Sequence, residues 1–331
     1  MSRSLQLEHH HVPSYSLAKF RPIARKTCPP LPEKTIIMNS TYTYDLAFSR
    51  NIGWVTEDEQ QILRRKRVAI AGMGGVGGSH LLTLTRLGIG GFHLADFDTF
   101  ELANFNRQAG AMSSTIGQSK VEVLAKQARD INPELEITTF PQGVTSDNLQ
   151  SFLDGADAYV DGLDFFTLNI RRAVFAACGA SGIPAVTAAP LGMGTALLNF
   201  LPGHLSFEDY FCLEGYSEEE QLLRFLVGLS PAMLQRGYLV DPSAVDLAHH
   251  RGPSTAMACE LCAGVAATQV LKLLLGRGKV IAAPRGLHFD AYRNKLETTW
   301  RPGGNRHPLQ RLALMIARRH FGRQYRAAMP S

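Results

Sequence analysis

The chain has 331 residues, of which 45% are apolar and 19% are charged, and these proportions are typical of a globular protein. Its length suffices for one large α/β domain or two smaller ones. The five cysteines are an odd number and widely scattered, which excludes a disulfide framework, so we expect a reducing, cytoplasmic setting. No apolar run that would indicate a secretory signal occurs at the start of the sequence.

The formal net charge of +5 is concentrated near the C-terminus. Residues 301–331 contain seven arginines and no acid, so the rest of the chain carries about −2. This basic tail could bind nucleic acid or an acidic protein surface. The more ordinary interpretation is a surface helix that packs on the domain through its apolar side chains. Those side chains are Leu309, Leu312, Leu314, Ile316 and Phe321.

The elements begin after an N-terminal extension, 1–42, which is rich in proline, contains the adjacent histidines His9–His11 and has no sustained periodicity. Thr56 and Glu59 form a capping pattern that predicts a helix to about Arg65. Apolar runs then alternate with helical segments. Strands are expected at 68–72, 92–96, 135–140, 157–161 and 184–189, and helices at 76–87, 118–131, 146–153 and 168–181. This alternation predicts a parallel, doubly wound sheet.

The alternation ends after Gly194. A further strand is expected at 195–201, a mixed helical elaboration at 203–253, and two strands about a turn within 286–300. The apolar stretch 255–275 contains charged side chains, which favours a buried helix over a membrane span. The predicted fold is therefore α/β and Rossmann-like, with a doubly wound, mainly parallel sheet, a helical insertion and a C-terminal antiparallel strand pair. We expect one domain over 43–300, followed by a basic helical tail, 301–331.

A glycine-rich loop, GMGGVG, follows the first strand of this sheet. Its glycines are Gly72, Gly74, Gly75 and Gly77. Glycine permits the tight turn and the close approach of a phosphate, and the next helix offers free N–H groups at its start. The loop predicts a nucleotide site, but alone it fits NAD, FAD, a methyl-donor cofactor or ATP.

Two acids, Asp96 and Asp98, end the second strand. A carboxylate at this point can accept hydrogen bonds from both ribose hydroxyls, and Asp96 is the favoured candidate. Asp98 is expected either to orient a neighbouring base or to cap the turn.

Two cations follow within a polar stretch, Arg107 beside Asn104 and Gln108, and then Lys120. A dehydrogenase holds its pyrophosphate with the helix end alone. A nucleotidyl transfer, in contrast, develops charge on the departing pyrophosphate that fixed cations stabilise. The pair therefore indicates cleavage of ATP between its α- and β-phosphates.

Asp164 lies just beyond the fourth strand, at the edge of the sheet where ligands bind in such folds. A carboxylate there can hold Mg²⁺ between phosphates. Asp161 is the competing residue, but its position nearer the strand favours a structural role.

With these residues assembled, the chain resembles the ThiF/MoeB/HesA group of ubiquitin-activating-enzyme-like adenylyltransferases over roughly 45–200 and 254–300. The motifs that carry the resemblance are GMGGVG, DFD, the N-x-x-R-Q of Asn104–Gln108, the G-x-x-K of Gly117–Lys120 and the strand-end Asp164. The resemblance implies that ATP and Mg²⁺ activate the C-terminal carboxylate of a small ubiquitin-like or sulfur-carrier protein as an acyl adenylate. It also implies a homodimer in which an arginine, here Arg50, enters the partner's phosphate site.

The chain departs from that family in two ways. Phe165 replaces the asparagine that usually follows the strand-end aspartate, so contacts to the nucleotide, and activity itself, are in question there. Many members bind zinc through two Cys-x-x-Cys pairs, but this chain has only Cys259 and Cys262. One pair cannot close a tetrahedral site, and although Cys178 and Cys212 could complete it, zinc is not expected.

Some members form a covalent intermediate on a cysteine beyond the nucleotide site. Cys212, within the elaboration, is the candidate nucleophile, although the neighbouring acids argue against the low pKa that a thiolate needs. The elaboration could bind the acceptor through Phe207, Tyr210 and Phe211, or it could be a helical flap covering the sheet.

Three other functions remain open. A dehydratase of the same superfamily adenylates a carboxylate on a modified tRNA nucleoside (the threonylcarbamoyladenosine type), and the arginine-rich tail could then hold RNA phosphates. An NAD-dependent oxidoreductase is compatible with the glycine loop. A non-catalytic relative would bind only a nucleotide and a partner. No membrane partner is expected.

Overall fold

The computed structural model describes residues 42–247 and 249–328, with side chains as far as Arg319. The predicted N-terminal extension, with His9–His11 and Cys28, lies outside the described residues apart from Tyr42. The side chains of Phe321, Arg323 and Arg326 also lie outside the description.

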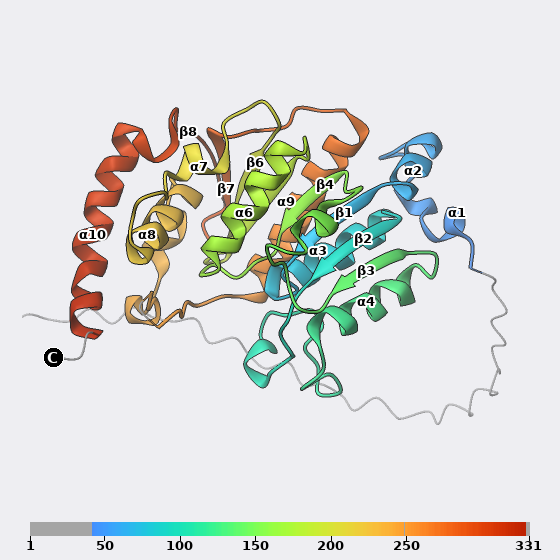
Figure 1. Ribbon diagram of the computed structural model, residues 1–331, viewed down its shortest axis with the longest axis horizontal. Helices are drawn as coiled ribbons and strands as arrows, with labels where there is room; N and C mark the ends of the chain where they lie inside the picture. Colours follow the sequence, from blue (N-terminus) through green and yellow to red (C-terminus); the bar gives the residue numbers. More distant parts are fainter. Residues whose placement is uncertain (1–41, 248, 329–331) are drawn as a thin grey trace, which may run out of the picture. The chain divides into compact units, whose positions relative to one another are not determined.

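One eight-stranded sheet, in the order β3-β2-β1-β4-β5-β6-β7-β8, runs through the described residues (Figure 1). Strands β1 to β5 pair in parallel, and β6, β7 and β8 continue the sheet by antiparallel pairing. The strands are β1 Arg67–Ala71, β2 Gly91–Ala95, β3 Glu136–Phe140, β4 Ala158–Asp161, β5 Ala185–Leu191, β6 Gly194–Phe200, β7 Arg285–Asp290 and β8 Lys295–Trp300. The predicted Rossmann-like, mainly parallel sheet with a C-terminal antiparallel pair is confirmed, and β6 is where the direction reverses.

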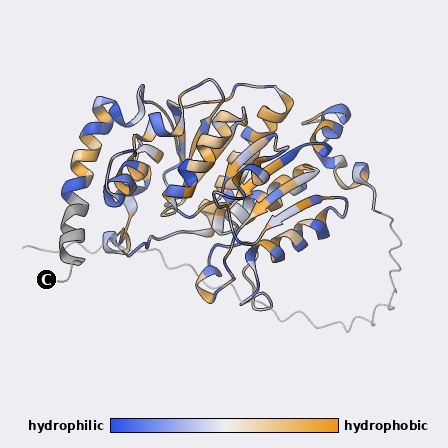
Figure 2. Ribbon diagram, in the orientation of Figure 1, coloured by the Kyte–Doolittle hydropathy of each residue, from blue (hydrophilic) through white to orange (hydrophobic). Residues whose placement is uncertain are grey.

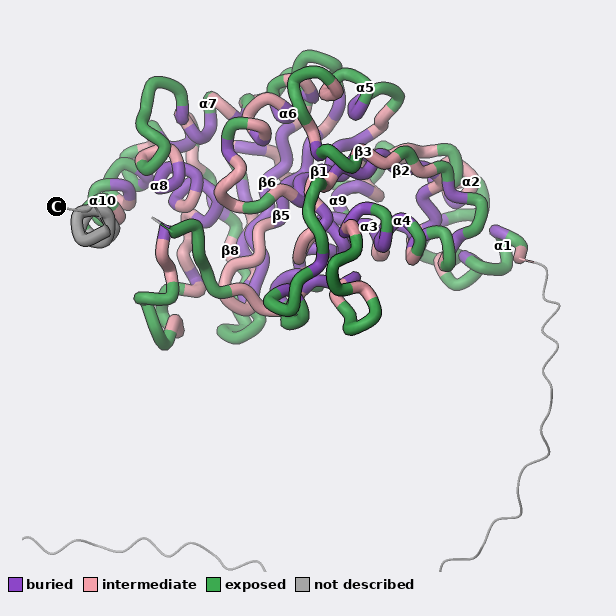
Figure 3. The backbone as a smooth tube through the Cα atoms, turned by 60° about the horizontal axis from the view of Figure 1, so that its bottom comes forward, coloured by how far each residue is buried: buried purple, intermediate pink, exposed green. Residues whose placement is uncertain are grey.

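Helices cover both faces of the sheet because successive side chains of each buried strand point to opposite sides. In β1, Val68 and Ile70 face one core, and Ala69 and Ala71 face the other. The first core is covered by α2 Glu57–Arg64, α3 Gly75–Leu87, α4 Lys120–Ile131 and α9 Ala256–Leu275. The second is covered by α5 Leu149–Leu153, α6 Leu168–Ala180, α7 Phe207–Phe211 and α8 Glu218–Leu229. Figure 2 shows apolar residues gathered on the central strands, and Figure 3 shows the same strands buried.

Short helices connect these layers. They are α1 Tyr44–Ala47 and the 3₁₀ helices η1 Ser49–Asn51, η2 Leu102–Asn104, η3 Leu234–Tyr238, η4 Pro242–Ala244 and η5 Gly304–Arg306. The capping box predicted at the start of α2 is present, since Thr56 and Glu59 each bond the backbone of the other.

Helix α9 is the one helix among the described residues that is long and apolar enough to cross a membrane. It packs against α3 and against β5 and β6, and Cys262, Ala263 and Ala266 on it are fully buried. The buried helix predicted at 255–275 is therefore confirmed as part of the first core.

The aromatic residues of the elaboration were the wrong candidates for acceptor contacts. Phe207, Tyr210 and Phe211 are at most 4% exposed and pack with Phe200 and Phe225 in the second core. The first part of the elaboration is thus a helical layer that covers the sheet. It buries its aromatic face because the antiparallel end of the sheet would otherwise expose an apolar surface.

The C-terminal helix α10, Pro308–Ala328, is packed on α8, as the ordinary interpretation of the tail predicts. The packed face carries Leu314, only 2% exposed, and Gln310, whose side chain donates a 3.0 Å hydrogen bond to the Val227 carbonyl. The prediction that Leu309, Leu312 and Ile316 also pack on the domain is wrong. They are 44–54% exposed because they lie on the opposite side of the helix from Leu314.

Candidate nucleotide-binding site

The glycine loop lies where the chain order of the strands reverses, between β1 and β4. Gly72 has a positive φ of 87°, and a Cβ there would come within 2.1 Å of the Gly162 carbonyl oxygen. A Cβ on Gly77 would come within 1.7 Å of the Gly72 carbonyl oxygen. The backbones of β1, α3 and β4 therefore meet at van der Waals contact, which only glycine allows. In open α/β sheets this crevice is where ligands bind.

The start of α3 offers backbone donors to an anion. Gly74 is its N-cap and supplies no side-chain hydrogen bond, so the first N–H groups of the helix have no capping partner. The nearest atom to a Cβ built on Gly74 is Nε2 of Gln108, at 3.8 Å. Gln108 is 7% exposed, and its Oε1 has no hydrogen-bond partner among the described residues. A buried amide thus lies beside the loop.

Asp96 is fixed to the glycine loop. Its carboxylate accepts hydrogen bonds from the N–H groups of Met73, at 2.5 Å, and Asp98, at 2.8 Å. Burial raises the pKa of Asp96 above its ordinary value, although these bonds and the charge of Lys120 oppose the shift. Each carboxylate oxygen keeps a second lone pair, so the group can also accept from two hydroxyls of a ribose.

Lys120 begins α4 at the same edge of the sheet. Its side chain is 8% exposed, and its ammonium lies 2.9 Å from Oδ2 of Asp98. Asp98 also accepts the Lys120 N–H through its backbone carbonyl. Asp98 therefore contacts both Lys120, through its carboxylate and carbonyl, and Asp96, the candidate for binding the ribose, through its N–H.

Arg107 lies beside the start of α3. Its Cγ is 3.5 Å from the position of a Cβ on Gly75, and its Nη1 donates to the Ala103 carbonyl and to Oδ1 of Asn106. The turn that carries it is fixed by Asn104, whose carbonyl accepts the N–H groups of both Arg107 and Gln108. The side chain of Asn104 accepts the Glu101 N–H at 3.0 Å.

The two candidate acids after β4 have different environments. Asp161 is buried in an ion pair with Arg171 at 2.9 Å and accepts a hydrogen bond from Thr187, so it is structural. Asp164 is exposed and accepts the Phe166 N–H at 3.0 Å. Mg²⁺ is usually held by one or two carboxylates together with substrate phosphates and water, and an exposed carboxylate at this crevice fits that requirement.

Phe165, at the position where the resemblance predicts asparagine, packs against Phe166 and Phe225, with ring centroids 5.1 and 5.2 Å apart. The guanidinium of Arg171 lies over the same Phe225 ring. Phe165 therefore extends the second core toward the nucleotide site, where an asparagine would have added a polar side chain.

Arg50 does not join the other two cations within one chain. It lies on η1 and is exposed, and its neighbour Asn51 donates a 3.1 Å hydrogen bond to the Leu87 carbonyl at the C-terminal end of α3. The glycine loop is at the opposite end of this 13-residue helix, which spans about 20 Å at 1.5 Å per residue.

The cysteines are divided between the two faces of the sheet. Cys262 donates to Thr195 within the first core, Cys259 packs against Gly75, and Cys178 belongs to the second core. These three cannot ligate one ion because the sheet separates them. Among residues 42–247 and 249–319, no group of three His, Cys, Asp or Glu side chains is placed to hold a metal.

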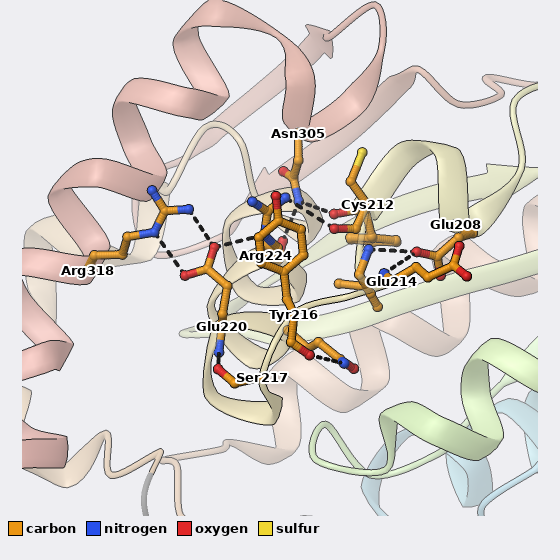
Figure 4. A network of polar contacts seen from close by, with 12 residues as sticks. Glu208, Cys212, Glu214, Tyr216, Ser217, Glu220, Arg224, Asn305 and Arg318 are labelled. Carbon is orange, nitrogen blue, oxygen red and sulfur yellow. Dashed lines mark hydrogen bonds and ion pairs between the residues drawn. The ribbon is translucent and has the colours of Figure 1, made fainter.

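Cys212 caps the C-terminal end of α7 in a left-handed conformation, with φ of 54° (Figure 4). Its thiol donates to the Asp209 carbonyl, and its own carbonyl accepts from Arg224. Burial raises the pKa of the Cys212 thiol, although Arg306 and Arg224 oppose the shift. The group is therefore a thiol at neutral pH, which makes it a weak nucleophile.

Sequence reasoning missed a segment that crosses this edge of the sheet before α9. Asn106 donates a 2.9 Å hydrogen bond to the Ser254 carbonyl, and His250 stacks on Phe166 with ring centroids 4.6 Å apart. Neither contact has a signature in the spacing of the chain, because each joins residues more than 80 positions apart.

A glycine loop, a ribose-competent carboxylate and two cations at a strand-order reversal define a nucleotide-binding α/β domain of the doubly wound class. The chain belongs to the ThiF family, whose model matches residues 48–311.

Curated relatives match less than half of the chain. The chain is 35% identical over 125 residues to the tRNA threonylcarbamoyladenosine dehydratase of Bacillus subtilis, covering 38% of this chain and 49% of that protein. It is 32% identical over 145 residues to the sulfur carrier protein ThiS adenylyltransferase of Escherichia coli, covering 44% and 57%. The chain thus spans about half the length of the curated relatives it matches.

Solved structures share the fold over more of the chain. E. coli MccB with AMPCPP and MccA has a TM-score of 0.60 at 19% identity, covering 78% of this chain and 72% of that one. The E. coli tRNA N6-threonylcarbamoyladenosine dehydratase, TcdA, has a TM-score of 0.53 at 22% identity, covering 70% and 95%. At these identities the likeness shows the fold.

Proposed function

We propose that this chain is an ATP-dependent adenylyltransferase that converts a carboxylate into an acyl adenylate. The observation that carries the proposal is that two cations are attached to one glycine loop, one directly beside it and one through the acids that follow β2. Arg107 lies beside Gly75 at the start of α3, and Lys120 is tied through Asp98 to the carboxylate of Asp96. The helix end alone can bind the pyrophosphate of a dinucleotide, so a dinucleotide site needs neither cation. Transfer from ATP needs both, because the departing pyrophosphate gains negative charge.

In the proposed reaction a carboxylate oxygen attacks the α-phosphorus of ATP. The bond from that phosphorus to the bridging oxygen breaks, and pyrophosphate leaves with the electron pair. Arg107 and Lys120 stabilise the charge on the leaving group, Asp96 holds the ribose, and Asp164 binds Mg²⁺. Arg50 acts from a second copy of the chain in a homodimer. Positioning and charge stabilisation supply most of the acceleration.

The proposed acceptor is the C-terminal carboxylate of a small ubiquitin-like or sulfur-carrier protein. Support comes from the similarity to the ThiS adenylyltransferase and to the molybdopterin-synthase adenylyltransferase of E. coli. Such a substrate presents a flexible carboxylate that can enter the exposed edge of the sheet near Asp164.

Exchange of labelled pyrophosphate into ATP tests the proposal, with candidate carrier proteins as acceptors. We expect Arg107→Ala and Lys120→Ala each to lower the exchange rate about 10²–10³-fold with acceptor saturating. Lys295→Ala, which removes a surface lysine paired with Glu297 on β8, is the matched control and should leave exchange unchanged. Full exchange in both cation variants would contradict the assignment.

A second candidate keeps the adenylation and changes the substrate to a carboxylate on a tRNA nucleoside. It is favoured by the similarity to tRNA threonylcarbamoyladenosine dehydratases from three bacteria and by the arginines of α10. Arg311 and Arg319 are exposed on this helix. If tRNA is the substrate, Arg311→Ala with Arg319→Ala should weaken binding and reduce its salt dependence. Binding of equal strength and salt dependence would remove this candidate.

The NAD-dependent alternative is disfavoured by the membership of the ThiF family. The melting temperature distinguishes the two, because a ligand that binds only the folded state raises it. We expect ATP with Mg²⁺ to raise it and NADH to leave it unchanged.

A further inference from the structure

We infer that Asn106 is a positioning residue for Arg107 and that it couples this arginine to residues 246–247 and 249–255, called the bridging segment below. The inference rests on the proposed function, in which Arg107 stabilises the departing pyrophosphate. Asn106 is not one of the motif positions that carry the resemblance, which are Asn104, Arg107 and Gln108.

Both ends of the Asn106 amide are engaged with different partners. Its Oδ1 accepts a hydrogen bond from Nη1 of Arg107 at 2.9 Å, and its Nδ2 donates to the Ser254 carbonyl at 2.9 Å. Only one orientation of the amide satisfies these partners, because a guanidinium can only donate and a carbonyl can only accept. The amide group is planar, so a shift of Ser254 moves the oxygen that Arg107 bonds.

The bridging segment contacts two different loops of the nucleotide site. At one end, Asp246 and Arg251 exchange backbone hydrogen bonds of 2.9 and 3.0 Å, and the enclosed His250 stacks on Phe166. Phe166 also donates its N–H to the carboxylate of Asp164. The segment is thus held by the two loops that carry the proposed catalytic residues, through Phe166 beside Asp164 and Asn106 beside Arg107.

At its other end the segment leads into α9. Thr255 is the N-cap of that helix and donates to the Gly192 carbonyl at 2.9 Å, and Cys259 one turn later contacts the start of α3 beside Gly75. Ser254 therefore has a well-defined backbone position. It is a suitable anchor for an exposed side chain such as Asn106, which otherwise has several rotamers available.

Arg107 depends on this anchor because it is long and only partly buried. Its Nη1 has two acceptors, the Ala103 carbonyl and the Asn106 side chain. Loss of the second acceptor lets the guanidinium sample orientations in which it does not face the phosphates, and fewer molecules then hold the productive geometry. The effect belongs to kcat, because the leaving group acquires its charge in the transition state.

A double-mutant cycle measured by pyrophosphate exchange tests the positioning role. We expect Asn106→Ala to lower kcat about tenfold and to change KM for ATP less than about twofold. In an Arg107→Ala background the same change should have an effect below about twofold, since residues that act through one another are not additive. Gln221→Ala is the control, because the Gln221 amide likewise donates to a backbone carbonyl, that of Tyr216, away from the site. An equal loss in both backgrounds would overturn the inference.

Asn106→Asp separates the two contacts. The aspartate keeps an oxygen for Arg107 but has no N–H for the Ser254 carbonyl. We expect kcat to fall as in Asn106→Ala, and amide hydrogen exchange across 249–256 to quicken in both variants but not in Gln221→Ala. Wild-type kcat with quickened exchange in Asn106→Asp would overturn the coupling.

If the wild-type chain shows no pyrophosphate exchange with any acceptor, the proposed function fails. Hydrogen exchange then still tests the bond to the segment, and unchanged protection in Asn106→Ala would overturn that part.

Discussion

Gly72 and Gly162 approach each other so closely that a Cβ on Gly72 would lie 2.1 Å from the Gly162 carbonyl oxygen. The contact joins the loops after β1 and β4, which lie next to each other in the sheet and far apart in the chain. It places the glycine loop directly against the loop that leads to Asp164.

Gly72→Ala should lower the free energy of unfolding by about 2–4 kcal/mol, because the clash adds to the strain of a positive φ. Gly264→Ala is the matched control. Gly264 lies within α9 with no atom within 4 Å of an added Cβ, so alanine there should stabilise the chain by about 0.5–1 kcal/mol. Urea unfolding of the two variants measures both effects. A similar change in the two would show that the Gly162 contact does not restrict Gly72.

Asp98→Ala removes the carboxylate partner of the buried Lys120 ammonium. We expect a loss of about 1–3 kcal/mol in the free energy of unfolding, because an almost fully buried charge is left without its acceptor. Saturating ATP should restore most of that loss, since a triphosphate would offer Lys120 new anionic partners and binds only the folded chain. Denaturation with and without ATP checks this expectation. A deficit that ATP leaves unchanged would separate Lys120 from the phosphate site.

The pair Glu220–Arg318 should make the docking of α10 sensitive to acid. Burial favours the neutral form of Glu220, but the hydrogen bonds and charges of Arg318 and Arg224 outweigh it, so the pKa of Glu220 is lowered. The folded chain therefore prefers the ionised form. This stabilisation is complete above the ordinary pKa of 4.5 and is lost as the pH falls through the lowered value.

Arg318→Ala should consequently reduce the free energy of unfolding by about 1 kcal/mol at pH 7 and by less at pH 3. Urea titrations at both values give the comparison, with the exposed Arg319→Ala as the control. An equal deficit at the two pH values would assign the effect of Arg318 to packing instead of charge.

Two leucines on α10 give a direct test of which face is docked. Leu314 is 2% exposed and Leu312 is 49% exposed. Leu314→Ala should cost about 2–4 kcal/mol, and Leu312→Ala should change the free energy of unfolding by less than about 0.5 kcal/mol. The reverse order would mean that α10 docks through its other face.

The parts of the fold that sequence predicted are those that local rules determine. The glycine loop, the acids after β2 and the lysine that begins α4 each follow the end of a strand or begin a helix. In a parallel sheet these points lie at one edge. The same reasoning assigns different roles to Asp161 and Asp164, because a residue nearer the strand is more deeply buried.

The parts that sequence could not predict depend on which surfaces meet in three dimensions. The sequence alone is compatible with Phe207 and Phe211 facing a partner. In the structure they pack on the apolar surface of the antiparallel end of the sheet. Leu312 and Leu314 are equally apolar, and only the position of α8 determines which one is buried. In the sequence, Asn106 is one of several polar residues in NFNRQ. Its contact with Ser254, 148 positions later in the chain, is visible only in the structure.

Helix α3 has a consequence for the proposed enzyme as a pair of subunits. It holds the glycine loop at one end and the turn that carries Arg50 at the other, so neither subunit alone can bring all three cations to one ATP molecule. Inactive chains carrying Arg50→Ala and Lys120→Ala should then complement each other when mixed, since a heterodimer contains one intact site. Specific activity should also fall on dilution, because dimers dissociate into single chains whose sites each lack the Arg50 supplied by the other subunit.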